Sequence, residues 1–138
     1  MDLGTLEALQ RIRSTGKKRM DGDSVRGAIN LDHITMTAIQ TAPHGVVNNE
    51  TVFNFRQHEQ VVTADYVGGK IMNGYLVGLR DANRLTFSYC QLQTDGRLDH
   101  GHSQCEVAVS ENGRIRITEH FAWGSRGGDT GVNILEEL

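Results

Sequence analysis

Three short polar segments divide the second half of the chain into strands of matched length, and they constrain the fold more than any other feature. They are Arg80-Asp81-Ala82-Asn83-Arg84, Gln93-Thr94-Asp95-Gly96-Arg97 and Ser110-Glu111-Asn112-Gly113-Arg114. In each segment a small polar residue precedes a Gly or Asn, which is typical of a type I turn closed by a bulge. We therefore expect a three-residue hairpin loop at each turn, and the loop length then fixes the register of the flanking strands.

These registers predict which residues face each other across neighbouring strands. The first hairpin pairs Tyr75 with Tyr89, and the second pairs Tyr89 with Gly101. The third pairs Cys105 with Glu119. All three registers place the large apolar side chains on one face of the sheet. We expect position 101 to be small because the Tyr89 ring covers it, an arrangement in which an aromatic side chain shields a strand glycine.

Alternating apolar and polar residues indicate further strands over residues 33–41, 50–57 and 131–137, and another that ends in a two-residue hairpin at Gly68-Gly69. A meander of about eight strands joined by short turns is typical of an antiparallel barrel. An open meander would leave two unpaired edges, so we expect the first strand to close on the last. The predicted fold is all-β, an antiparallel up-and-down barrel of lipocalin or avidin-like architecture, whose interior is filled by side chains or holds one small ligand.

The chain of 138 residues divides into an N-terminal segment, residues 1–26, and a barrel domain, residues 27–138. Apolar residues at spacings of three predict a short amphipathic helix over residues 2–13, followed by a polar linker. The apolar residues of this helix are Leu3, Leu6, Leu9 and Ile12. The helix could plug one mouth of the barrel, pack on its outside or mediate assembly into a homo-oligomer, and the sequence does not choose among these.

Composition and residue placement limit the possible partners of the protein. A net charge of −3, with the only basic cluster in residues 11–19, argues against nucleic acid as a partner. No apolar stretch is long enough for a membrane span or a signal core, so we expect a cytoplasmic protein.

Cys90 and Cys105 are predicted on opposite faces, where they cannot form a disulfide. Three histidines are predicted to point away from the interior, so we expect no metal site, and no cofactor motif is present. They are His100, His102 and His120.

From about residue 50 onward the chain contains several short motifs that it shares with a known family. They are Phe55-Arg56-Gln57, Tyr66-Val67-Gly68-Gly69, Asn73-Gly74-Tyr75 with Gly78, Tyr89-Cys90-Gln91, Gly101-His102-Ser103, Asn112-Gly113-Arg114-Ile115-Arg116-Ile117, Glu119 with Trp123, and Ile134-Leu135-Glu136-Glu137. In these motifs the chain resembles a family of small bacterial β-barrel proteins of unassigned function, many of which carry the automatic label N-acetylglutamate synthase. An acetyltransferase binds the coenzyme A pyrophosphate with a Gly-rich turn at a helix N-terminus. The glycines of this chain fall in hairpins instead, and we expect Gly124 to Asp129 to be a loop between strands.

The predicted inner face carries polar and aromatic residues that could form a ligand pocket. The candidate ligand-binding residues are Asn73, Tyr75, Tyr89, Gln91, Ser103, Phe121 and Trp123. Buried polar groups must be hydrogen-bonded, so these residues either satisfy each other or converge on a ligand. For Asn73 and Gln91 the two interpretations are evenly balanced, since both side chains could simply contact water at the open end of the barrel.

Glu119 is the candidate catalytic residue because it interrupts an apolar inward run between Ile117 and Phe121. A desolvated carboxyl group with a raised pKa can act as a general acid or base. The alternative is an ion pair with Arg80, Arg84 or an N-terminal residue. The sequence thus favours a barrel that binds a small, partly apolar molecule. Its rivals are a cofactor-free cyclase, isomerase or hydrolase that uses Glu119, and a structural module with a filled interior.

Overall fold

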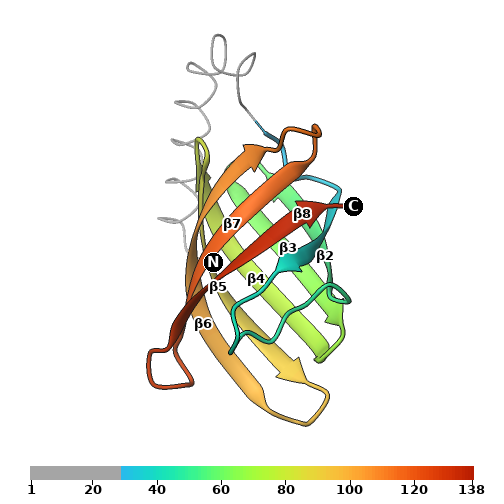
Figure 1. Cartoon of the computed structure of the whole chain (residues 1–138). Helices are drawn as coiled ribbons and strands as arrows, with labels where there is room; N and C mark the ends of the chain where they lie inside the picture. Colours follow the sequence, from blue (N-terminus) through green and yellow to red (C-terminus); the bar gives the residue numbers. More distant parts are fainter. Residues whose placement is uncertain (1–28) are drawn as a thin grey trace, which may run out of the picture.

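A computed structural model of the chain describes residues 29–138, and these form a closed barrel of eight antiparallel strands (Figure 1). The strands are β1 (Ile34–Gln40), β2 (Val52–His58), β3 (Val61–Gly68), β4 (Ile71–Asp81), β5 (Arg84–Gln93), β6 (Leu98–Val109), β7 (Ile115–Trp123) and β8 (Thr130–Glu137). Each strand pairs with its neighbours in the sequence, and β1 pairs with β8. The predicted eight-stranded up-and-down barrel is therefore confirmed.

Two sequence-based expectations concern the N-terminal segment and membrane-spanning helices. The amphipathic helix predicted over residues 2–13 and the linker that follows it lie outside the described residues. Between residues 29 and 138, no helix is long and apolar enough to cross a membrane.

The registers predicted for the hairpins β5–β6 and β6–β7 are confirmed. Tyr89 faces Gly101, and Cys105 faces Glu119. A Cβ atom added to Gly101 would lie 2.5 Å from the Tyr89 hydroxyl group and 2.3 Å from the Ala122 carbonyl oxygen. The absence of a side chain at position 101 is thus a requirement of the packing. Cys105 is buried and Cys90 is exposed, as predicted, and both are free thiols.

The phase predicted for β4 is wrong by one residue. The turn between β4 and β5 is a two-residue loop, Ala82-Asn83, so that Arg80 faces Leu85 and Tyr75 faces Cys90. Ala82 has a positive φ of 54°, the conformation that allows so tight a turn. The inward phase of β4 therefore carries Gly74, Leu76 and Gly78, whereas Tyr75, Val77 and Leu79 point outward.

The preceding turn is also displaced from its predicted position. Gly69 and Lys70 form the two-residue loop, and Gly68 ends β3 opposite Ile71. The predicted Gly68-Gly69 hairpin would bring Tyr66 opposite Ile71, and this pairing is wrong because Tyr66 faces Gly74. The glycine makes room for the aromatic side chain, because a Cβ atom at position 74 would lie 2.3 Å from the ring.

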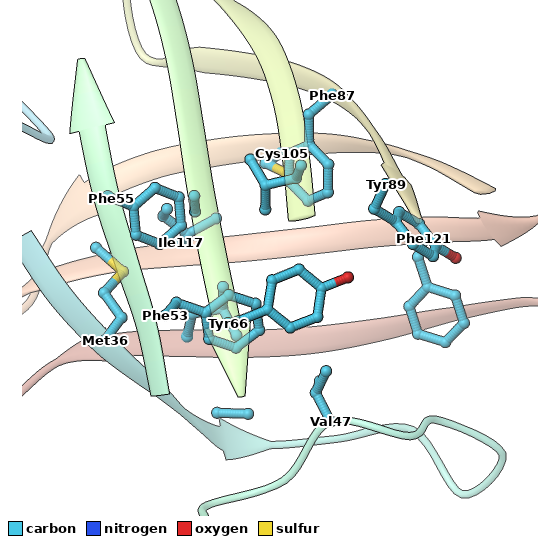
Figure 2. Packing of buried hydrophobic residues seen from close by; sticks show 14 of the residues in the cluster. Met36, Val47, Phe53, Phe55, Tyr66, Phe87, Tyr89, Cys105, Ile117 and Phe121 are labelled. Carbon is cyan, nitrogen blue, oxygen red and sulfur yellow. The ribbon is translucent and has the colours of Figure 1, made fainter. Parts of the chain in front are cut away.

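The barrel interior is packed with apolar side chains from all eight strands (Figure 2). At one end residues 29–33 close the barrel, with Leu31 fully buried. Arg80 holds this segment, since its guanidinium group donates to the carbonyl oxygen of Ile29 at 2.7 Å and to Gln57 Oε1 at 3.2 Å. At the opposite end the connection between β1 and β2, residues 41–51, packs buried Ala42, Val46 and Val47 against the core.

Candidate ligand-binding site

A cavity of about 20 Å³ lies inside the barrel beneath the β1–β2 connection. This volume holds about one water molecule. The lining residues are Gly45, Val46, Val47, Phe53, Tyr66, Leu76, Phe87, Tyr89, Gln91, Glu119, Phe121, Trp123 and Asn133. Apolar walls with a few converging polar groups are the usual composition of a small-molecule site.

Aromatic side chains form two sides of the cavity. The Trp123 ring meets Tyr89 and Phe121 edge to face, with ring centroids 5.8 and 5.6 Å apart. The rings of Phe53 and Tyr66 stack with their centroids 4.6 Å apart, and Figure 2 shows both side chains in the barrel interior. Such pairs are favourable beyond their buried area because the positive edge of one ring meets the negative face of the other or the rings stack with an offset.

Glu119 lines the cavity and lies between two hydrogen-bond donors. The Ser103 hydroxyl group donates to Oε2 at 2.6 Å, and the Asn133 amide donates to Oε1 at 3.1 Å. Burial raises the pKa of Glu119, and the two hydrogen bonds only partly oppose this effect. The site thus holds a carboxyl group that favours its protonated form more than an exposed glutamate does.

The cationic partners considered for Glu119 lie elsewhere in the described part of the barrel. Arg80 is bonded to Ile29, Gln57 and the Ala82 carbonyl oxygen at the opposite end. Arg84 is exposed at the start of β5. Within residues 29–138 no ion pair to Glu119 is present.

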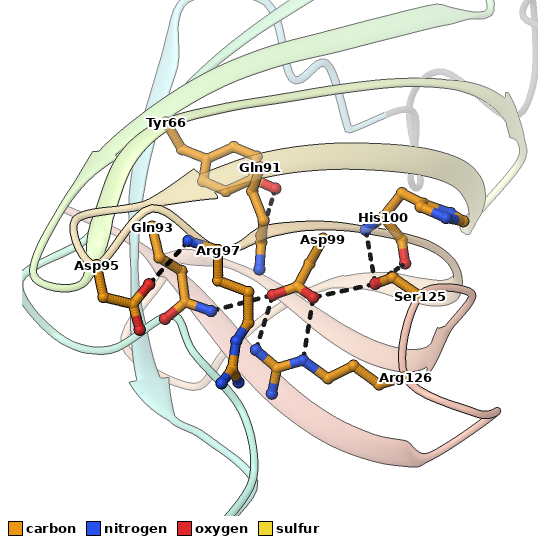
Figure 3. Close-up of polar contacts among 9 residues, drawn as sticks. All are labelled: Tyr66, Gln91, Gln93, Asp95, Arg97, Asp99, His100, Ser125 and Arg126. Atoms are coloured by element: carbon orange, nitrogen blue, oxygen red, sulfur yellow. Dashed lines mark hydrogen bonds and ion pairs between the residues drawn. The ribbon is translucent and has the colours of Figure 1, made fainter.

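Two tyrosines contribute protonated hydroxyl groups to the cavity. The Tyr66 hydroxyl group donates to Gln91 Oε1 at 2.8 Å (Figure 3). Burial, reinforced by the negative charge of Glu119, raises the pKa of Tyr66 and of Tyr89 above the usual tyrosine range. Both side chains therefore remain neutral at physiological pH.

A charged network borders the cavity at the mouth of the barrel (Figure 3). Asp99 is only 2% exposed, and Arg126 donates to both of its oxygens, at 3.1 and 2.7 Å. Gln93 and Ser125 each donate to the same carboxylate at 3.0 Å. Burial alone would raise the pKa of Asp99, but these hydrogen bonds outweigh it and the pKa is lowered. Arg126 also lies over the Trp123 ring, 4.4 Å from its centroid.

We call residues 41–51, which cover the mouth, the lid loop. Its first residues are tied to β8, because Asn133 Oδ1 accepts from Thr41 Oγ1 at 2.9 Å and from the Ala42 amide at 3.3 Å. Its last residues are tied to β3 through Thr51 Oγ1, which donates to the Gly68 carbonyl oxygen at 3.1 Å. Between these anchors Val47 points into the barrel (Figure 2).

The structure brings together six of the eight predicted site residues. These are Tyr89, Gln91, Ser103, Glu119, Phe121 and Trp123. The inward orientation predicted for Asn73 and Tyr75 is wrong, because the one-residue shift of β4 places both on the outside of the barrel, where Tyr75 is 53% exposed. Leu76 takes the interior position opposite Tyr89.

Sequence reasoning did not assign Tyr66, Asn133 or the lid residues to the site. Asn133 carried a usable signal, since it is a polar residue on the same phase of β8 as buried Leu135. The lid carried another, because Val46-Val47 is a pair of large apolar residues in a connection that has no others of that size.

The histidines predicted on the outer face, His100, His102 and His120, are exposed. His120 lies 3.4 Å from Glu106 of β6. In the part of the chain that the structure describes, no group of three or more His, Cys, Asp or Glu side chains is arranged to hold a metal ion. The segment Gly124 to Asp129 forms the loop between β7 and β8, as predicted.

Comparison with known proteins adds a family to this geometry. A family model described as "Avidin-like protein" matches residues 29–138, which is the whole of the described barrel. No curated protein and no solved structure matches the chain.

Proposed function

Because the chain belongs to the avidin-like family over residues 29–138, we propose that it is a binding protein that takes a small, partly apolar molecule into the barrel beside Glu119. The observation that carries this proposal is the convergence of an aromatic wall and polar side chains on one interior cavity. Small-molecule sites commonly occur in the mouths of β-barrels and have this composition. An eight-stranded barrel is wide enough for one such ligand.

Entry of a ligand requires the lid loop to move, because the cavity of about 20 Å³ holds only one water molecule. Hydrogen bonds tie the two ends of the lid loop to β8 and β3, His44 Nε2 bonds to the Thr130 carbonyl oxygen, and the Asn49 carbonyl oxygen accepts from Thr37. Val46 and Val47 between them make no hydrogen bond to the described strands and contribute only apolar contacts. A partly apolar ligand can therefore replace these contacts with its own.

The test is a fragment screen by thermal unfolding, followed by fluorescence titration of Trp123, the only tryptophan in the chain. A ligand at about 100 times its Kd should stabilise the native state by about 2.7 kcal/mol. Val47→Phe should fill the mouth and weaken binding by about 5- to 100-fold, which corresponds to the usual cost of overpacking. Val109→Phe is the matched control, because Val109 ends β6 at the end of the barrel away from the lid loop and is 53% exposed. Equal loss of affinity in both variants would argue against an interior site.

A second candidate is an enzyme on the same barrel, a cofactor-free cyclase, isomerase or hydrolase in which Glu119 transfers a proton. The specific observation in its favour is that Glu119 lines the cavity and has a raised pKa. A carboxyl group poised in this way can protonate or deprotonate a bound molecule. Mass spectrometry of the bound ligand after incubation should reveal a product. Glu119→Gln should then lower turnover by about 10²- to 10⁴-fold and leave binding largely intact.

The outer face of β4 supports a third element of the proposal, self-association into a homo-oligomer. Tyr75, Val77 and Leu79 lie side by side on this face, and each is at least 50% exposed. Val61 and Thr63 of β3 flank Leu79 and Val77. Contiguous exposed apolar surface of this kind is typical of protein interfaces.

A further inference from the structure

The indole N–H group of Trp123 is buried without a hydrogen-bond partner in the described residues. The side chain lines the cavity, and the residue is 4% exposed. An indole nitrogen can only donate, and buried donors in native proteins are almost always paired. The other unpartnered buried side-chain atom between residues 29 and 138 is Gln60 Oε1, in the turn between β2 and β3. Among the fully buried side-chain atoms of the cavity lining, Trp123 Nε1 is thus the one without a partner between residues 29 and 138.

The surroundings of Trp123 hold its ring in place. The Arg126 guanidinium group covers one face at 4.4 Å, and Tyr89 and Phe121 contact the ring edge to face. Arg126 is itself fixed by two hydrogen bonds to Asp99. A ring packed in this way cannot rotate toward a partner elsewhere, so the N–H group is a preorganised donor.

The amide and carboxyl acceptors that line the cavity are already engaged. Gln91 Oε1 accepts from Tyr66, and the two oxygens of Glu119 accept from Ser103 and Asn133. The remaining donors of the lining are the Trp123 N–H group, the Gln91 amide nitrogen and the Tyr89 hydroxyl group, of which only the hydroxyl group can also accept. A complementary ligand therefore presents an acceptor oxygen.

Charge decides which kind of acceptor fits. Glu119 lines the cavity without a cationic partner in the described residues, and Arg126 is committed to Asp99. An anionic ligand would have to be buried beside these carboxyl groups with no cation among the lining residues to compensate it, which is strongly unfavourable. A neutral oxygen carries no such penalty.

We infer that the ligand carries a neutral carbonyl group, as in a ketone, lactone, amide or lactam, whose oxygen accepts a hydrogen bond from Trp123 Nε1. This inference rests on the proposed function, because it specifies the chemistry of the ligand in the same cavity. It assigns Trp123 the role of the residue that selects a carbonyl compound over a hydrocarbon of the same shape.

The test uses the single indole cross-peak that Trp123 gives in a ¹H–¹⁵N correlation spectrum of the full-length protein. Three small probes of similar size are titrated: cyclopentanone, methylenecyclopentane and cyclobutanecarboxylate. Cyclopentanone should move the indole proton downfield in a saturable way. Methylenecyclopentane, which replaces the oxygen by a CH₂ group, should cause no comparable downfield shift. Cyclobutanecarboxylate should bind more weakly than cyclopentanone.

Trp123→Phe provides the matched variant, because it keeps an aromatic ring and removes the donor. The substitution should weaken the binding of cyclopentanone by about 5- to 100-fold more than the binding of methylenecyclopentane. This is the effect expected when a buried acceptor loses its partner. Should this variant fail to fold, the cross-peak of the unmodified protein still decides the question.

The outcomes separate this inference from the proposed function. If both neutral probes bind but neither shifts the indole proton selectively, the carbonyl assignment is overturned and the interior site stands. Tighter binding of the carboxylate than of the ketone overturns the requirement for neutrality. If no probe binds, the inference fails as stated, whereas the interior site is judged independently by the comparison of Val47→Phe with Val109→Phe.

Discussion

Asn133 links the buried carboxyl group of Glu119 to the loop that covers the cavity. Its amide nitrogen donates to Glu119 Oε1 at 3.1 Å, and its amide oxygen accepts from Thr41 and from the Ala42 backbone. A single side chain thus contacts both the floor of the site and the first residues of the lid loop. Any change at Asn133 should therefore alter lid opening and the environment of Glu119 together.

Asn133→Ala should loosen the lid. The substitution removes two hydrogen bonds to the lid loop and one to Glu119, and an unpaired buried group costs about 1–3 kcal/mol. Amide hydrogen exchange over residues 42–47 should accelerate more than exchange in β5 and β6. Asn112→Ala, in the exposed turn between β6 and β7, is the control and should leave the lid unchanged. Uniform acceleration across the barrel would contradict a specific coupling.

Glu119→Gln should change the pH dependence of stability. The folded state raises the pKa of Glu119 above its ordinary value of 4.5, so it binds more protons than the unfolded state once the pH exceeds this value. The native protein should lose stability as the pH rises from about 4.5 through the folded pKa, at no more than about 1.4 kcal/mol per pH unit.

The amide of Glu119→Gln does not titrate, so its free energy of unfolding should lack this decline. Urea denaturation of both proteins between pH 4 and 8 measures the difference. The two curves should diverge steadily above pH 4.5, with the substituted protein favoured. Parallel curves would show that Glu119 does not titrate differently in the folded and unfolded states.

Gly101→Val should destabilise the barrel. A Cβ atom at this position meets the Ala122 carbonyl oxygen at 2.3 Å and the Tyr89 hydroxyl group at 2.5 Å, and the backbone oxygen cannot move aside as a flexible side chain would. We expect a loss of about 1–3 kcal/mol or more in the free energy of unfolding. His102→Val, one residue further along β6 on the exposed face, is the control in the same strand. A Gly101→Val protein as stable as this control would refute the close approach of Tyr89.

Leu79→Lys should disrupt self-association. A lysine in the apolar surface formed by Tyr75, Val77 and Leu79 would place a charge at the proposed interface, where it would have to be desolvated. Light scattering after size-exclusion chromatography should give a multiple of the mass of one chain for the unmodified protein and a smaller mass for the variant. Gln104→Lys, on the exposed face of β6, should behave like the unmodified protein. An unmodified protein that is monomeric at all concentrations would remove this part of the proposal.

The strands β5, β6 and β7 could be placed from the sequence because their turns contain glycine where the backbone requires it. Gly96 and Gly113 have positive φ values of 90° and 83°, in the region that few other residues adopt readily. The turn residues therefore reveal both the position and the length of each loop. This information was enough to bring Tyr89, Gln91, Ser103, Glu119, Phe121 and Trp123 into one interior.

The orientation of β4 could not be read in the same way, because alanine occupies the position of positive φ in the Ala82-Asn83 turn. Alanine gives no sign of that conformation. A second signal was available in the glycines of β4. Gly74 faces Tyr66 and Gly78 faces Phe87, the same pairing of glycine with an aromatic ring that correctly placed Gly101 opposite Tyr89. Pairing β4 by its glycines would have turned Asn73 and Tyr75 outward.

The lid loop and Asn133 depend on contacts between distant parts of the sequence. Thr41 and Asn133 are 92 residues apart and meet only because β1 closes on β8. Alternation along a strand indicates which side chains point inward, but it does not specify which of them meet across the barrel.

The pairing of β1 with β8 makes the strand order of the barrel circular. The Leu138 amide donates to the Thr35 carbonyl oxygen at 2.9 Å, so the last residue of the chain lies beside the first strand. A circularly permuted barrel of residues 29–138, in which a linker joins Leu138 to Ile29 and the chain is opened between Asp95 and Gly96 in the exposed β5–β6 turn, would keep every strand neighbour. The cyclic order of the strands thus defines the fold, and we expect that the chain can be opened at an exposed turn without changing this order.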